Sequence, residues 1–221
     1  MEYIKRGESI SLVVLCNISP IFIHLKWMNE REIITAQEYE TAKGRPFSLG
    51  PDASAFQIGD DKKVFCNQER FQIESSDITD SKRIIEICLN TLRLSEPKGY
   101  AAVGVNAQMD FTFLTEADAI RFGNTFVPLE TWEDLIPSPR VGSFNIQEHL
   151  PNPTIDHPRK AINIQSIGED KQTKLPLVRI GVNYHHPINN FDNVEKVLER
   201  AAELYAKFGE ICVMIFEEKL A

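Results

Sequence analysis

Alternating apolar and polar residues, with many β-branched and aromatic side chains, recur along most of this chain and predict β-strands. The clearest strand candidates are residues 9–16, 63–75, 99–114, 143–150, 160–168 and 175–188, of which 63–75 could be one long strand or a hairpin through 67–69. The segment 20–27, "PIFIHLKW", also alternates, and we expect it to be extended. Well-marked helical spacing is confined to residues 81–95, 115–126 and a long segment after Asp192. This succession predicts an α+β fold, a largely antiparallel sheet with helices packed on one face, and not the regular strand–helix alternation of a parallel sheet.

The last predicted helix carries a regular apolar stripe and is expected to run from Asp192 through Gly209 almost to the end of the chain. Its apolar positions are four and three residues apart: Val194, Leu198, Ala201, Tyr205, Phe208, Cys212 and Ile215. Such a stripe suits either a long C-terminal helix laid across the sheet or a coiled-coil homodimer. The first interpretation is favoured, because charge pairing beside the stripe is not evident.

Length and charge exclude several classes of protein. The chain has 221 residues, which suits a single domain, 1–221, with a buried core. Its formal net charge of −8 argues against a long groove for nucleic acid, which needs a concentrated positive field. No segment reaches the roughly 18 apolar residues of a membrane-spanning helix. The four cysteines are scattered, so we expect reduced thiols and a cytoplasmic, soluble protein.

A short internal echo raises the question of duplication. The sequence Gly-Val-Asn occurs at 104–106 and again at 181–183, and in each case a capped helix is predicted to begin about ten residues later. One interpretation is a duplicated strand–helix unit, with similar halves at about 9–127 and 140–221. The other is coincidence, since only three residues are shared.

The motifs "VFCNQERFQIESSD", "AVGVNAQMDFTF", "FVPLETWEDLI" and "IGVNYHHPI" occur in this order along the chain. In that order the chain, over roughly residues 9–205, resembles a family of uncharacterised bacterial proteins marked by LGIN, PxxWxxL and VNDHY motifs. The sequence departs from the family where Tyr184-His185-His186 stands in place of Asp-His-Tyr. The resemblance implies no activity, no cofactor and no catalytic residues.

His185 and His186 are the residues most suggestive of chemistry. If the strand continues through them, their side chains point to opposite faces, which makes joint metal ligation unfavourable. A metal site would need further ligands such as His24, His149, His157 or Asp192, none of which has a usual metal spacing. We therefore expect no metal and no cofactor, and the histidines to mark the end of a strand.

Four other residues are candidates for binding. Asn106 and Asn183 could bond a neighbouring turn or contact a ligand. Trp27 and Trp132 lie in polar surroundings and could close an edge of the core or anchor a partner.

The chain has no nucleophile elbow, phosphate loop or dinucleotide fingerprint. The sequence therefore favours a non-catalytic binding or protein-interaction module, whose partner is another protein or a small molecule. The alternative is a hydrolase-like enzyme whose site the fold assembles around His185 or His186 with Asp192.

Overall fold

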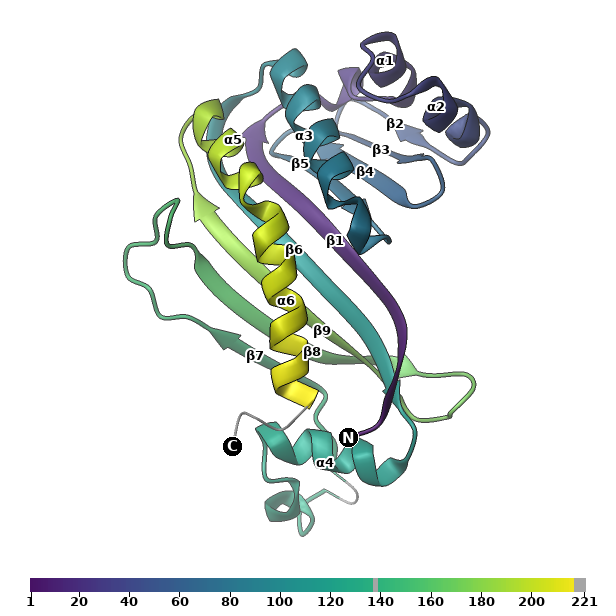
Figure 1. Cartoon of the computed structure of the whole chain (residues 1–221), viewed down its shortest axis with the longest axis vertical. Coiled ribbons are helices and arrows are strands. Elements are labelled where there is room, and N and C mark those ends of the chain that lie inside the picture. The colour runs from purple at the N-terminus through teal and green to yellow at the C-terminus, as the bar shows by residue number, and fades with distance from the viewer. Residues whose placement is uncertain (137–138, 217–221) are drawn as a thin grey trace.

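The computed structural model describes residues 1–136 and 139–216. Within that range one antiparallel sheet has nine strands in the order β2-β3-β4-β5-β1-β6-β9-β8-β7 (Figure 1). The strands are β1 (Tyr3–Asn17), β2 (Ser48–Leu49), β3 (Ala53–Ile58), β4 (Lys62–Asn67), β5 (Arg70–Ser75), β6 (Lys98–Phe113), β7 (Ser143–Gln147), β8 (Arg159–Glu169) and β9 (Pro176–Pro187). The helices are α1 (Leu25–Glu30), α2 (Ala36–Ala42), α3 (Ser81–Ser95), α4 (Glu116–Phe126), α5 (Phe191–Glu199) and α6 (Ala201–Phe216).

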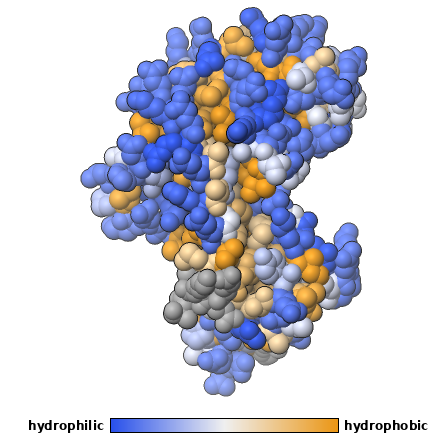
Figure 2. Space-filling model, in the orientation of Figure 1, coloured by the Kyte–Doolittle hydropathy of each residue, from blue (hydrophilic) through white to orange (hydrophobic). Residues whose placement is uncertain are grey.

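Alternation along the strands separates a core face from an open face. In β1, Leu12 and Val14 are buried, whereas Ser11 and Val13, which alternate with them, point to the other side and are half-buried. Helices α3, α5 and α6 lie in front of the sheet in Figure 1 and cover the core face. From the same side, Figure 2 shows apolar residues gathered along the middle of the molecule between hydrophilic flanks. The predicted α+β fold is confirmed, with the sheet antiparallel throughout.

The C-terminal helical region carries the predicted stripe on its buried side. All seven apolar positions named above are buried within this single chain. The region is divided at Arg200 into α5 and α6, so it is not the uninterrupted helix that the spacing predicts. It also begins earlier, because the side chain of Asn190 caps it by accepting a hydrogen bond from the backbone N–H of Asn193 at 2.9 Å.

The segment 20–27 is not extended as its alternation predicts. Pro20 opens a 3₁₀ turn, Pro20–Phe22, and α1 follows. The Nδ1 atom of His24 accepts a hydrogen bond from the backbone N–H of Trp27 at 3.1 Å, which caps α1. These local caps outweigh the alternation, which is too short to define a strand by itself.

The element order repeats once. A long strand, a helical connection, a meander of three strands and a helix occur first as β1, α1–α2, β3–β5 and α3, and then as β6, α4, β7–β9 and α5–α6. The long strands β1 and β6 pair at the centre of the sheet, and the two meanders extend away from them on either side. The division into two similar halves, at about 9–127 and 140–221, stays a prediction.

Among the described residues, no helix has both the length and the apolar content needed to cross a bilayer.

Candidate functional site

The open face of the sheet contains a hollow of about 500 Å³, which we call the polar hollow. Strands β1, β5, β6, β7, β8 and β9 all contribute side chains to it. Seven lining residues carry amide side chains: Gln72, Asn106, Gln108, Asn145, Asn163, Gln165 and Asn183. An amide offers both donors and an acceptor, so the lining can make hydrogen bonds of either kind.

One residue that lines the hollow, Gly181, has no side chain. Gly181 lies between Gln108 of β6 and Asn163 of β8 in the sheet register, and Asn163 in turn faces Asn145 of β7. A Cβ atom built on Gly181 would meet only backbone oxygens, at 3.9 and 4.0 Å. The space above Gly181 is therefore open, and longer polar side chains surround it.

Some polar groups of the hollow are already paired. The side-chain amide of Asn183 donates a hydrogen bond to Oδ1 of Asn106, its direct neighbour across the β6–β9 pair. Gln108 Nε2 donates to Ser9 Oγ at 2.7 Å. These bonds hold the side chains on one side of the hollow in place, which favours a preformed site.

The charge on this face is largely compensated. Arg179 forms two hydrogen bonds of 2.7 Å with the carboxylate of Asp110, from Nε and Nη2. The bond to Asp110 raises the pKa of Arg179 despite the opposing effect of burial, and Glu74 adds to the rise. Glu74 is the other charged residue in the lining. The hollow is therefore polar without a strong excess of either charge.

Four amides remain available. Among the residues that the structure describes, Gln72, Asn145, Asn163 and Gln165 make no side-chain hydrogen bond within the chain. They line the hollow on both sides of Gly181. Their donors and acceptors can turn toward a bound molecule.

The structure brings Asn106 and Asn183 together in the hollow, and it separates the two histidines. His185 lies on the open face opposite Gly104 and Arg159, outside the lining of the hollow. Burial, and then the positive charge of Arg159, lower its pKa. His186 points to the core face and is 1% exposed.

His186 lines a separate cleft of about 420 Å³ beside α6. Its Nδ1 lies 2.8 Å from the backbone oxygen of Ile155, and since a carbonyl only accepts, this nitrogen carries the proton. Nε2 is buried and makes no hydrogen bond. Burial lowers the pKa of His186 and outweighs the opposite effect of the bond to Ile155, so the neutral form of the ring is favoured. In the same cleft Arg200 bonds Asp156 at 3.0 Å.

The remaining predicted residues lie elsewhere. Trp27 is half-buried on α1 and packs against the core. Trp132 ends a 3₁₀ turn, Leu129–Trp132, and is 46% exposed. Asp192 is exposed in the first turn of α5 and lines neither the hollow nor the cleft. Across residues 1–136 and 139–216, no group of three or more His, Cys, Asp or Glu side chains has an arrangement that could hold a metal ion.

Most residues of the polar hollow were missed by the sequence analysis, although a signal was present. The pattern Asn-x-Gln occurs at 106–108, 145–147 and 163–165, each time within a strand. Because strand side chains alternate, the two amides of each pattern lie on the same face. A repeated Asn-x-Gln in antiparallel strands therefore indicates a shared polar surface.

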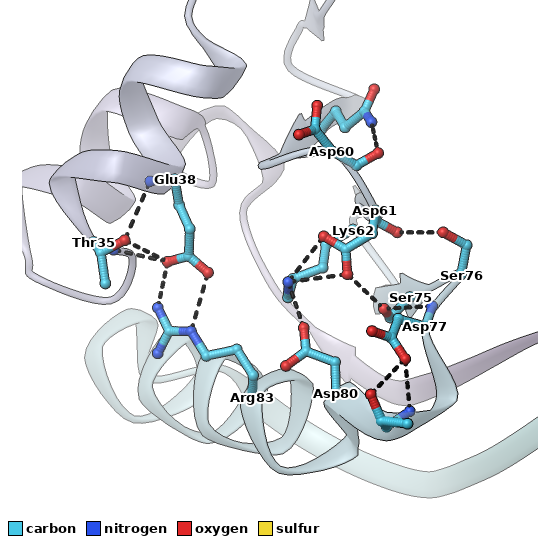
Figure 3. A network of polar contacts seen from close by, with 12 residues as sticks. Thr35, Glu38, Asp60, Asp61, Lys62, Ser75, Ser76, Asp77, Asp80 and Arg83 are labelled. Atoms are coloured by element: carbon cyan, nitrogen blue, oxygen red, sulfur yellow. Dashed lines mark hydrogen bonds and ion pairs between the residues drawn. The ribbon is translucent and has the colours of Figure 1, made fainter.

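A second polar cluster, near the start of α3, is satisfied internally and is structural (Figure 3). Arg83 of α3 donates to Glu38 of α2 from Nε at 3.1 Å and from Nη2 at 2.6 Å. Lys62 of β4, which is buried, contacts Asp61 and Asp80. These bonds tie α2, α3 and the β4–β5 hairpin together.

No protein-family model and no curated protein matches this sequence. Among solved structures, the chain is similar to an aspartate kinase from Clostridium acetobutylicum, with 9% sequence identity and a TM-score of 0.26. The similarity covers 89% of this chain and 33% of the kinase, so the chain spans about a third of that protein's length. Similarity at this level supports no inference about fold or activity.

Proposed function

We propose that this chain is a non-catalytic binding module whose polar hollow holds a small, neutral, polyhydroxylated molecule such as a sugar. The observation that carries the proposal is the set of unpaired amides that lines the hollow on both sides of the empty position at Gly181. A hydroxyl both donates and accepts a hydrogen bond, as an amide side chain does, so the two groups are complementary. A volume of about 500 Å³ suits a small molecule.

The same geometry disfavours charged ligands and long apolar ones. The guanidinium of Arg179 is held by Asp110, so it is not free to bind a phosphate or carboxylate. Most buried apolar side chains of the strands lie on the opposite face, beneath the helices, and Val13 is an apolar side chain of the open face that lines the hollow. Selectivity would follow from unpaired polar groups, since a ligand that leaves them unsatisfied is rejected.

The enzyme alternative is less well supported. A hydrolase needs a base, a nucleophile and an orienting group within hydrogen-bonding reach of one another. His185 and His186 lie on opposite faces of β9, and Asp192 lines neither cavity that these faces contain.

The four cysteines are buried and reduced, which supports our further proposal of a cytoplasmic location.

The test is to fill the hollow without disturbing the fold. Gly181→Val places a branched side chain in the open space, and the added Cβ makes only ordinary contacts. The matched control is Gly7→Val, also in a strand, where an added Cβ meets no atom within 4 Å and the residue is outside the lining. Binding of a panel of neutral mono- and disaccharides is measured by calorimetry and by the NMR shifts of side-chain amides.

We expect at least one sugar to bind the wild type and Gly7→Val equally, and Gly181→Val roughly tenfold more weakly or not at all. Side-chain amide signals of Asn145 and Asn163 should shift on binding to the wild type. Equal binding to Gly181→Val would place the site elsewhere. Failure of the whole panel at millimolar concentration would overturn the assignment to neutral sugars.

A further inference from the structure

A second cavity, of about 460 Å³, lies between α2 and the edge strand β2, and we call it the α2 cavity. None of its lining residues belongs to the polar hollow. Its walls are mainly apolar and include Leu25, Tyr39, Pro46, Phe47, Leu49 and Phe56. Phe47 is 73% exposed and Leu49 is 42% exposed, so apolar surface remains open to solvent here.

The charged residues of this cavity are all basic. Lys26, Lys43 and Arg45 line it, and no Asp or Glu is among the lining residues that the structure describes. This contrasts with the chain as a whole, which has 32 acidic and 24 basic residues. An apolar wall with a basic rim complements a molecule that has an apolar body and a negative group.

The two lysines are available to such a group. Lys26 pairs with Glu30 at 3.6 Å and Lys43 with Glu40 at 3.4 Å, and both pairs are mostly exposed. Exposed pairs of this kind add little to stability because water screens them, so a ligand anion can compete for the ammonium groups. Lys43 Nζ also lies 5.9 Å from the ring centroid of Tyr39, next to the apolar wall.

We propose that the α2 cavity binds an amphiphilic carboxylate, a small molecule with an apolar body and one carboxylate group. The apolar body would lie against Phe47 and Phe56, and the carboxylate would lie between Lys26 and Lys43. A carboxylate fits better than a phosphate, because phosphate sites commonly use free arginine forks or backbone nests. Here Arg45 is held by Asp60 and by the backbone oxygen of Thr41 at 3.3 Å.

The experiment compares three probes that share one chain length, decanoate, 1-decanol and decyl phosphate, each kept below its micellar or solubility limit. Binding to the full chain is measured by calorimetry at low and high salt. The expected order is decanoate first, with 1-decanol about tenfold weaker because it lacks the charge. High salt should weaken the binding of decanoate and leave that of decanol unchanged.

Two double variants test the lysines. Lys26→Gln/Lys43→Gln should lower decanoate affinity about tenfold and leave decanol affinity unchanged. The matched control, Lys82→Gln/Lys196→Gln, removes two exposed helix lysines outside the cavity and should change neither affinity. Equal affinity for decanoate and decanol, no decanoate binding, or no effect of the cavity lysines would overturn the proposal. Tighter binding of decyl phosphate would overturn the assignment to carboxylates.

Discussion

Replacing Lys62 by Met should destabilise the protein, because it leaves two carboxylates without their cation. The side chain of Lys62 is 8% exposed, and its Nζ lies 3.0 and 3.1 Å from the two carboxylate oxygens of Asp61. It also contacts Asp80, the residue before α3 (Figure 3). Asp61 further accepts a hydrogen bond from Ser75 Oγ at 3.0 Å, so one ammonium holds the hairpin to the helix.

The magnitude follows from how deeply the carboxylates are buried. Removing one partner of a fully buried ion pair costs about 3–5 kcal/mol. Asp61 and Asp80 are each 28% exposed, so water can partly replace the lysine. We therefore expect a loss of about 1–3 kcal/mol in the free energy of unfolding. For a chain of this size that corresponds to a fall in Tm of roughly 2–12 °C.

The effect should depend on pH with a definite sign. Burial alone would lower the pKa of Lys62, but its hydrogen bonds to Asp80 and Asp61 outweigh this effect and raise the pKa above 10.5. The charged lysine thus contributes fully below pH 10.5, and its contribution is lost as the pH rises through the folded-state pKa. Urea unfolding followed by circular dichroism should show a large difference between variant and wild type at pH 7 that shrinks above pH 10.5.

Two further variants isolate the cause. Lys63→Met changes the neighbouring exposed lysine, which points to the other face, and should shift stability by less than about 0.5 kcal/mol. Adding Asp80→Asn to Lys62→Met should recover part of the loss, since it removes one unpaired carboxylate. If Lys62→Met unfolds at the same urea concentration as the wild type at pH 7, this reasoning about the cluster is wrong.

Two other perturbations test the core. Leu198→Asp places a carboxylate at a fully buried position and should unfold the chain or lower its free energy of unfolding by more than about 3 kcal/mol. The control Val213→Asp, at a 50% exposed position, should cost less than about 1 kcal/mol. If Leu198→Asp is a folded monomer in light scattering with an unchanged Tm, the stripe is not buried. The four buried thiols should not react with a thiol reagent in the native state even at pH 9, and all four should react after denaturation. The reason is that burial raises the pKa of Cys16, Cys66 and Cys212 to about 12 and that of Cys88 still further. Rapid reaction of the native protein at pH 9 would show that the thiols are accessible.

The sequence determined the secondary structure of most of the chain and the fold class, because both follow from short-range periodicity. Alternation in residues 9–16 and 99–114 identified the two central strands: β1 contains the first segment, and β6 contains all of the second except its last residue. The 3.6-residue spacing identified α3 and the buried stripe of the last helices. The prediction of extended structure at 20–27 was wrong for a local reason. Pro20 opens a 3₁₀ turn and His24 caps α1, and these two effects outweighed a short alternation of apolar and polar residues.

The candidate sites depend on which strands become neighbours, and only the tertiary structure decided that. Asn106 and Asn183 each end a Gly-Val-Asn motif, so the sequence showed them as a related pair. The sequence around each one does not place them opposite each other, whereas the register of β6 with β9 does. The register of β8 with β9 sets Gly181 beside Asn163, and the two registers together create the polar hollow. Side-chain alternation tells which residues share a face of one strand. A binding site on a sheet also depends on the order and register of several strands, and long-range packing of the core fixes both.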